Sequence, residues 1–501
     1  MKNTITKCLL ILVVMMPFAS CTDDFLETSS TEDVSATNAT ATTENMNLVI
    51  NGIYRLFYTR LDNKNGSGNN RKGGIGSMMI QNSFMGEDVV QNAQANSSMI
   101  DFARWIKPFD ADDDRQLHNW RVMYRAIVNA NIVIAGGDEA VGPEEDKNAA
   151  LGQAYFLRAF AHFHLVQLYG KRYVAGGGND QLGIPIVLEP IIEPQARATV
   201  EAVYTQINED LTQAITLLDG YSRFNPSHAN QAVAQGLKAR VALVQSNFTE
   251  AVNMARLARA GLTLMDSSTY TSGFNDYNID EWMWGLHYNE EQGSNFTNFG
   301  GIMSRNFSSN QIRGNPKSIS QALYATIPGT DVRSAIFDPT GDHDNLPEGI
   351  SLISRHKRFP YTHQKFLAVS TGDSRGDIPL MRASEMYLIE AEALARSGTD
   401  DAGAAAALFT LASARDASYT LSTNTGQALI DEIDLQRRWE LWGEGFRFYD
   451  LKRQNKALNR NGSNHDFNLV LVSDVPAGDN RWQWMIPTDE LNANPLMVQN
   501  P

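Results

Sequence analysis

The sequence predicts a mainly α-helical protein that contains one irregular, loop-rich segment and a few short strands. Apolar residues recur at three- and four-residue steps over most of the chain, which is typical of amphipathic helices. This pattern fades between about residues 262 and 378, where Gly, Asn, Ser and aromatic residues predominate. We therefore expect a helical body with a loop-rich insert.

Several helices can be placed from periodicity and end signals. Met46 to Phe57 forms one apolar face, and Pro143 followed by two glutamates resembles a helix start that ends before Gly170. A polar, glycine-rich loop is expected at 62–77, and a short extended segment at 182–190 (LGIPIVLEP). Further helices are expected at 115–135, 200–218, 229–246 and 248–260.

A weak internal repeat suggests paired helices. Three similar tripeptides begin at Leu157, Leu237 and Met381, each expected early in an alanine-rich helix. Small residues allow paired helices to approach closely, as in tetratricopeptide-like hairpins. A generic antiparallel helix bundle is the alternative.

The loop-rich insert, about 262–378, contains one predicted strand. The segment EWMWGLHY alternates, which places Trp282 and Trp284 on the same face. A segment this long without regular structure is usually functional or disordered. Its high aromatic content favours a functional segment.

The N-terminus has the layout of a secretory signal. Lys2 and Lys7 precede an apolar run that is too short to span a bilayer, and small residues lead into Cys21. This junction resembles a lipoprotein cleavage site, although Phe18 stands where Leu is preferred. We expect a signal peptide at 1–20, a lipid on Cys21 and a flexible Thr/Ser/Asn-rich tether at 21–43. An ordinary signal with an incidental cysteine is the alternative.

Composition excludes several classes of function. The formal charge is −15, and removal of the signal makes it two units more negative, so nucleic-acid binding is not expected. Cys21 would be the only cysteine of the mature chain, which leaves no cysteine-based metal site. His162 and His164 stand two residues apart on a helix and face different directions. The sequence therefore predicts no cofactor and no metal site.

Two C-terminal motifs carry a specific resemblance. LQRRWELWGEGFRFYDLKRQ (435–454) and IPTDELNANPLMVQNP (486–501) resemble the SusD/RagB family, as do AYFLRAFAHFHLVQLYG, GIPIVLEP and IPLMRASEMYLIEAEALAR. The resemblance implies a nutrient-binding domain over 44–501 with tetratricopeptide-like helix pairs. It also implies a lipoprotein on the outer face of the outer membrane. Asp23 and Asp24 resemble the acidic export signal that directs some lipoproteins to that face. Such a protein captures glycans, or less often peptides, for a SusC-like TonB-dependent transporter and is not an enzyme.

The residues of the first motif also have a structural interpretation. Trp439, Trp442, Phe446 and Tyr449 recur at helical steps, which favours a packed face over a ligand platform. Gly443 and Gly445 indicate a bend or a close helix approach. Partly buried ion pairs are expected from Arg437, Arg438, Glu440, Glu444 and Arg447.

A glycan site needs exposed aromatic rings beside polar groups on surface loops. Two stretches, 82–105 and 281–307, supply both, although core packing is the alternative for each ring. Trp105 and Phe299 have the more polar surroundings. The predicted ligand-binding residues are Trp105, Phe299, Trp282, Phe84, Asp88, Asn92, Phe296 and Arg305. A glycoside hydrolase, which would need two carboxylates at a set distance, and a protein-binding scaffold are the rival functions.

Overall fold

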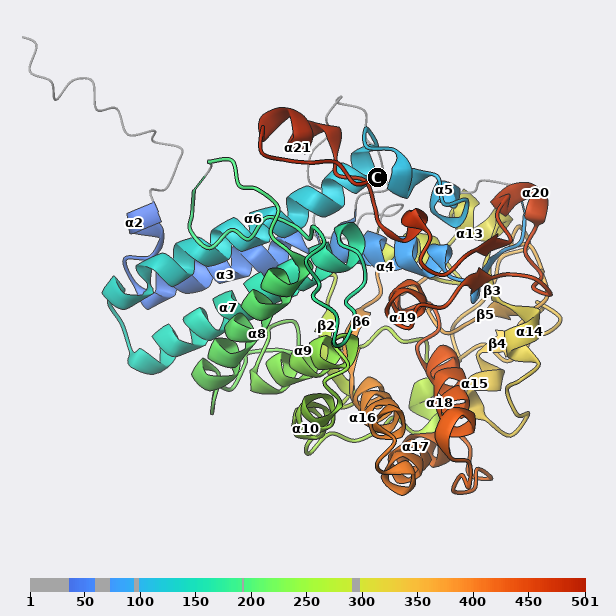
Figure 1. Ribbon diagram of the computed structural model, residues 1–501. Coiled ribbons are helices and arrows are strands. Elements are labelled where there is room, and N and C mark those ends of the chain that lie inside the picture. Colours follow the sequence, from blue (N-terminus) through green and yellow to red (C-terminus); the bar gives the residue numbers. More distant parts are fainter. Residues whose placement is uncertain (1–35, 59–72, 94–98, 192, 291–297) are drawn as a thin grey trace, which may run out of the picture.

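Long helices follow one another in an arc, beside a region of short helices, short strands and loops (Figure 1). The computed structural model describes residues 36–58, 73–93, 99–191, 193–290 and 298–501. Cys21 and the signal peptide lie outside these residues. No helix within the described ranges is long and apolar enough to cross a membrane.

The arc is built by sequential packing of neighbouring helices. Helix α6 packs on α7, α7 on α8, α8 on α9, α9 on α10, α10 on α16, and α16 on α17. This order confirms the mainly α-helical class and the paired-helix organisation. The long helices are α3 (Thr43–Leu56), α6 (Asp114–Gly136), α7 (Glu144–Tyr169), α8 (Val200–Leu217), α9 (Gln231–Val244), α10 (Phe248–Ala258), α16 (Ala383–Ser397), α17 (Asp401–Arg415) and α18 (Gly426–Glu440).

Local sequence explains where these helices begin and end. The Asp113 side chain accepts hydrogen bonds from the first amides of α6, and Thr199 caps α8 in the same way. Helix α7 begins after Pro143 with three acids in its first turn and ends at Gly170, as predicted. The predicted helices at 115–135, 200–218, 229–246 and 248–260 are confirmed to within two residues at each end.

Three predictions about local structure are wrong. The tether was expected to extend to residue 43, but Ala36–Ala39 form helix α2 against α6, and Thr42 pairs with Val141. Gly74 to Ser77, expected in a loop, begin helix α4. The repeat does not mark helix starts, because Leu157 lies in the middle of α7 and Met381 in strand β6.

Short elements make up the rest of the fold. A four-stranded antiparallel sheet has the order β1 (Val89–Gln91), β3 (Lys317–Ile319), β5 (Thr362–His363), β4 (Phe337–Asp338). Strand β2 (Trp282–Leu286) confirms the predicted strand and pairs with β6 (Ile378–Arg382), while β7 (Leu458–Asn459) pairs with β8 (Asp474–Val475). The remaining helices are α4 (Gly74–Met85), α5 (Ile100–Ala103), α11 (Ser267–Tyr270), α12 (Phe299–Met303), α13 (Asn310–Gly314), α14 (Gln321–Tyr324), α15 (Val332–Ala335), α19 (Arg447–Arg453), α20 (Phe467–Val470) and α21 (Thr488–Ala493), with 3-10 turns η2 (Lys107–Phe109), η3 (Gly137–Glu139) and η4 (Asn480–Trp482).

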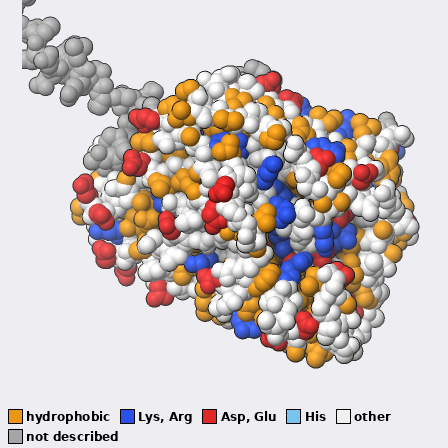
Figure 2. All heavy atoms as spheres, in the orientation of Figure 1, with side chains coloured by type: hydrophobic (Ala, Val, Ile, Leu, Met, Phe, Trp, Pro, Cys, Tyr) orange, Lys and Arg blue, Asp and Glu red, His pale blue; other side chains and the backbone are white. Residues whose placement is uncertain are grey.

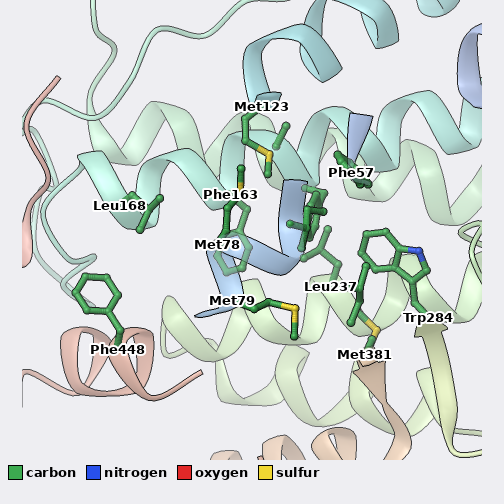
Figure 3. Close-up of a cluster of buried hydrophobic side chains, with 14 of the residues drawn as sticks. Phe57, Met78, Met79, Met123, Phe163, Leu168, Leu237, Trp284, Met381 and Phe448 are labelled. Carbon is green, nitrogen blue, oxygen red and sulfur yellow. The ribbon is translucent and has the colours of Figure 1, made fainter. Parts of the chain in front are cut away.

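The apolar core joins the arc to the strand pair. Trp284 of β2 lies edge-on to Phe156 and Phe160 of α7, with ring centroids 5.3 and 5.1 Å apart. Figure 3 shows Trp284 beside Met381 of β6 and Leu237 of α9 within this cluster. The first helices, the middle strand and the C-terminal half therefore share one core.

A buried cluster of eight charges crosses this junction. Arg382 Nη1 lies 2.6 Å from Glu281 Oε1 and 2.7 Å from Glu440 Oε1, and its Nη2 lies 2.7 Å from Glu444 Oε1. Arg415 Nη2 contacts Glu281 Oε2 at 2.7 Å. The set has four cations and four carboxylates, so its charges balance. We call it the buried charge cluster: Glu281, Asp331, Arg333, Lys365, Arg382, Arg415, Glu440 and Glu444.

Burial and ion pairing shift the pKa values of this cluster in opposite directions. Burial alone would raise the pKa of Glu440, but Arg415, Arg382 and Arg333 together hold that pKa well below its usual value. Burial lowers the pKa of Lys365 to about 8, although Glu444 opposes the shift from 2.6 Å. Glu440 is therefore ionised because its cations are in place.

Two glycines bring Glu444 into the cluster. Gly443 and Gly445 have φ angles of +77° and +86°, which turn the chain between the end of α18 and the start of α19. A Cβ on Gly443 would lie 2.8 Å from the ring of Phe366. The bend predicted from the sequence is confirmed, and so are the predicted ion pairs: Arg437 reaches Asp450, Arg438 reaches Asp88 and Arg447 reaches Glu87.

Replacement of Glu440 by Gln should lower the free energy of unfolding by about 3–5 kcal/mol, because Arg382 and Arg415 would keep buried charges without a full partner. Denaturant unfolding measures this change. Glu348→Gln, at an exposed position, is the control and should change stability by less than about 0.5 kcal/mol. Equal stability of the two variants would contradict the importance of the cluster.

Candidate functional site

Helix α4, which runs into the first of the two selected stretches, lies beside helix α12 of the second. Helix α12 packs against α4, which brings Phe299 to the residues that precede β1. Strand β1 pairs with β3, so Val89 lies opposite Ile319.

The aromatic residues predicted to bind a ligand are buried instead of exposed. Trp105 is 3% exposed, and its ring lies edge-on to Trp482 with centroids 4.8 Å apart. Phe299 lies edge-on to Phe366 at 4.9 Å, and Trp282 and Phe84 are also buried. The expectation that these rings are exposed on loops is wrong, because all four pack into the apolar core.

The predicted polar residues are used mainly within the fold. Asp88 binds Arg438 at 2.6 Å, and Arg305 is fully buried, where it donates to His343 and to the carbonyl of Lys357. Asn92 is half-buried and donates to the carbonyl of Pro316. Phe296 lies outside the described residues. Ligand contact by Asn92 and Phe296 stays a prediction.

Replacement of Trp105 by Ala should lower the free energy of unfolding by about 3–5 kcal/mol, as expected for a large ring removed from a core. Its indole also donates to the carbonyl of Met85 at 3.2 Å, and this bond would be lost. Thermal or denaturant unfolding measures the loss. Unchanged stability together with weaker glycan binding would restore Trp105 as a ligand platform.

Aromatic rings are exposed elsewhere, just beyond the end of β2. Tyr277 and His287 stack with centroids 4.7 Å apart and ring planes 18° from parallel. The His287 side chain is 49% exposed, and Tyr277 and Tyr58 are half-buried nearby, the latter edge-on to Tyr288 at 5.3 Å. We call Tyr58, Tyr277 and His287 the aromatic platform.

Asp377 holds the platform in place. His287 Nδ1 lies 2.8 Å from Asp377 Oδ1, and the backbone amide of Tyr277 donates to Asp377 Oδ2 at 2.8 Å. One buried carboxylate thus fixes both stacked rings. Burial raises the pKa of Tyr277 and of Tyr58, so both phenols remain neutral hydroxyls that can donate and accept hydrogen bonds.

A neighbouring loop extends this surface. The loop between α8 and α9 is bonded to β2, because Gly285 donates to the carbonyl of Pro226 and Arg223 donates to that of Met283 at 2.6 Å. The same loop carries Phe224, whose side chain is 94% exposed. Phe224 therefore presents an apolar ring to solvent on a loop that is anchored to β2.

Sequence reasoning missed this surface. Tyr277 stands in a short polar turn (GFNDYNID) and Phe224 in another (YSRFNPSHAN), away from the stretches richest in aromatics. His287 could have been selected from the sequence, because it stands at the polar end of the predicted strand. The stacking of Tyr277 on His287 depends on Asp377, which is distant in sequence, and so could not be read from the pattern.

Stacked rings beside neutral hydroxyls and an imidazole suit a sugar. A pyranose offers a C–H face to an aromatic ring and hydroxyls to groups in its plane, and both kinds of partner are present here. A helical-repeat arc that carries a loop-rich binding surface defines the class of this protein: a binding domain on a helical scaffold.

Comparisons with known proteins identify the family. A family model described as starch-binding associating with outer membrane matches residues 24–243, and a model described as the SusD family matches 348–501. Together they cover more than half of the chain. The chain belongs to the SusD family.

Individual relatives agree with this assignment. The chain is 23% identical over 390 residues to a SusD-like protein of Formosa agariphila, covering 68% of this chain and 70% of that one. The fold is similar to a SusD-like carbohydrate binding protein from Bacteroides vulgatus, with a TM-score of 0.79 and 24% identity over 91% of this chain and 98% of that one. A laminarin binding SusD-like protein has a TM-score of 0.69 at 20% identity, covering 92% and 98% of the two chains.

Proposed function

We propose that this chain is a cell-surface lipoprotein that captures oligo- or polysaccharide and delivers it to a SusC-type TonB-dependent transporter. Membership of the SusD family carries the proposal, since the model for 24–243 is described as starch-binding and associated with the outer membrane. The aromatic platform supports it independently, because it offers stacking rings on an exposed, anchored surface.

Capture without catalysis fits the chemistry of the platform. Its central carboxylate, Asp377, is buried and already bonded to His287 and to the amide of Tyr277. A hydrolase needs one carboxyl group to protonate the leaving oxygen and a second to act on the sugar. Asp377 instead positions rings, which is a binding role.

Replacement of Tyr277 or His287 by Ala should weaken binding of the best soluble glycan from a panel by about 1–3 kcal/mol, or about five- to 150-fold, by analogy with aromatic stacking on bases. Isothermal titration measures the affinity. Phe467→Ala, which removes an exposed ring from α20, is the control and should change affinity by less than about twofold.

The same samples test the class of function. Binding with no new reducing ends supports capture, whereas new reducing ends would indicate a hydrolase. Binding of peptides but of no glycan would favour the peptide-capturing branch of the family. Binding of neither would contradict nutrient capture.

The anchor and the partner can be tested together. Wild-type protein extracted in mild detergent should co-purify with a large TonB-dependent barrel, and Cys21→Ala should leave the membrane fraction or retain its signal peptide. Replacement of Asp23 and Asp24 by Ala should keep the lipid but reduce labelling of intact cells by an external protease. Repeated purification without a barrel, or normal labelling of both variants, would contradict this assignment.

A further inference from the structure

A groove beside α19 concentrates positive charge on a protein that is acidic overall. It has a volume of about 580 Å³ and lies between the end of α7 and the loop before η4. Figure 2 shows Lys and Arg side chains gathered in a hollow on this face. We call it the basic groove, lined by the cations Lys171, Arg172, Lys452 and Lys456 and by the amides Asn455 and Asn480.

Lys452 is the buried cation of this groove. Its ammonium donates to the carbonyls of Gln167 and Gly170, at 2.6 and 2.8 Å, at the C-terminal end of α7. Within the described part of the chain no carboxylate pairs with it. Burial lowers the pKa of Lys452 to about 7, so the folded protein holds this charge at a cost. Two backbone carbonyls, and no carboxylate, therefore hold Lys452 in the wall of the groove.

The other charges of the groove do not cancel this one. Lys171 is exposed and Arg172 half-buried, and among the described residues neither side chain has an ion-pair partner. Lys456 lies 3.3 Å from Asp434. Asp479, the carboxylate among the described lining residues, is bound by Arg481 at 2.9 Å. The groove therefore has a positive surplus on a chain of net charge −15.

We propose that the basic groove binds the carboxylate or sulfate groups of an acidic saccharide. Lys171 and Arg172 supply the accessible positive charge that an anionic substituent needs, Lys452 lies behind them in the wall of the groove, and Asn455 and Asn480 supply amides for neighbouring hydroxyls. This inference rests on the proposed function, because it names the class of glycan that the protein captures. The aromatic platform and the basic groove then bind different parts of one saccharide, or two separate saccharides.

The experiment compares three probes on the full chain: oligogalacturonate, a sulfated oligosaccharide and neutral maltohexaose, with inorganic sulfate as a fourth arm. One acidic oligosaccharide should bind about tenfold or more tightly than maltohexaose at low salt and should weaken steeply as salt is added. Lys171→Gln with Arg172→Gln should lower that affinity by about tenfold or more and leave the thermal midpoint unchanged. Lys452→Met should lower it as well.

The control is Arg55→Gln with Arg355→Gln, which removes two exposed positive charges from other elements and should change the affinity less than about twofold. Strong binding of neutral but not of acidic oligosaccharide would overturn this inference and leave the proposed function standing. Binding of neither would overturn both. Inorganic sulfate binding as tightly as the acidic oligosaccharide, or an affinity unchanged in the Lys171/Arg172 variant, would overturn the assignment of the groove to a saccharide.

Discussion

The buried charge cluster is the constraint on which the rest of the structure depends. Its eight charges come from the residue before β2, the cap and first turn of α15, the loop after β5, β6, α17, α18 and the turn before α19, so each element must be in place before the charges balance. A buried ion pair gives little net stability, but a buried charge without its partner costs several kcal/mol. The cluster therefore penalises any packing that lets the loop-rich region separate from the helical arc.

The sequence predicted the helical half of the fold well because the relevant forces are local. Helix ends follow from caps such as Asp113 and from the glycine after Tyr169, and the bend follows from Gly443 and Gly445. The sequence also indicated that Glu440 and Glu444 would lie in ion pairs. The sequence could not identify Arg382, Lys365 or the other distant partners, because those contacts form only when the loop-rich region packs against the helical arc.

The candidate site was harder to predict, for a related reason. Glycine- and asparagine-rich surroundings indicated that Trp105 and Phe299 were on the surface, yet both rings are buried. Polar side chains of the same stretch, such as Asn92 and Asp88, bind a backbone carbonyl and an arginine within the fold. Local polarity shows that a segment is irregular, but it does not show which side of the segment faces water. The aromatic platform needed Asp377 to bring Tyr277 and His287 together, and only the folded chain supplies that contact.

The buried charge cluster also connects the two surfaces to which we assign ligands. Glu281 fixes the first end of β2, and the platform residue His287 stands just beyond the other end of that strand. Glu444 fixes the start of the turn into α19, and Lys452 stands near the end of that short helix. One residue of each surface thus lies on a segment whose other end is fixed by this cluster. A binding protein that must present a flexible glycan in one orientation gains from such a frame, because a preorganised surface lowers the entropic cost of binding.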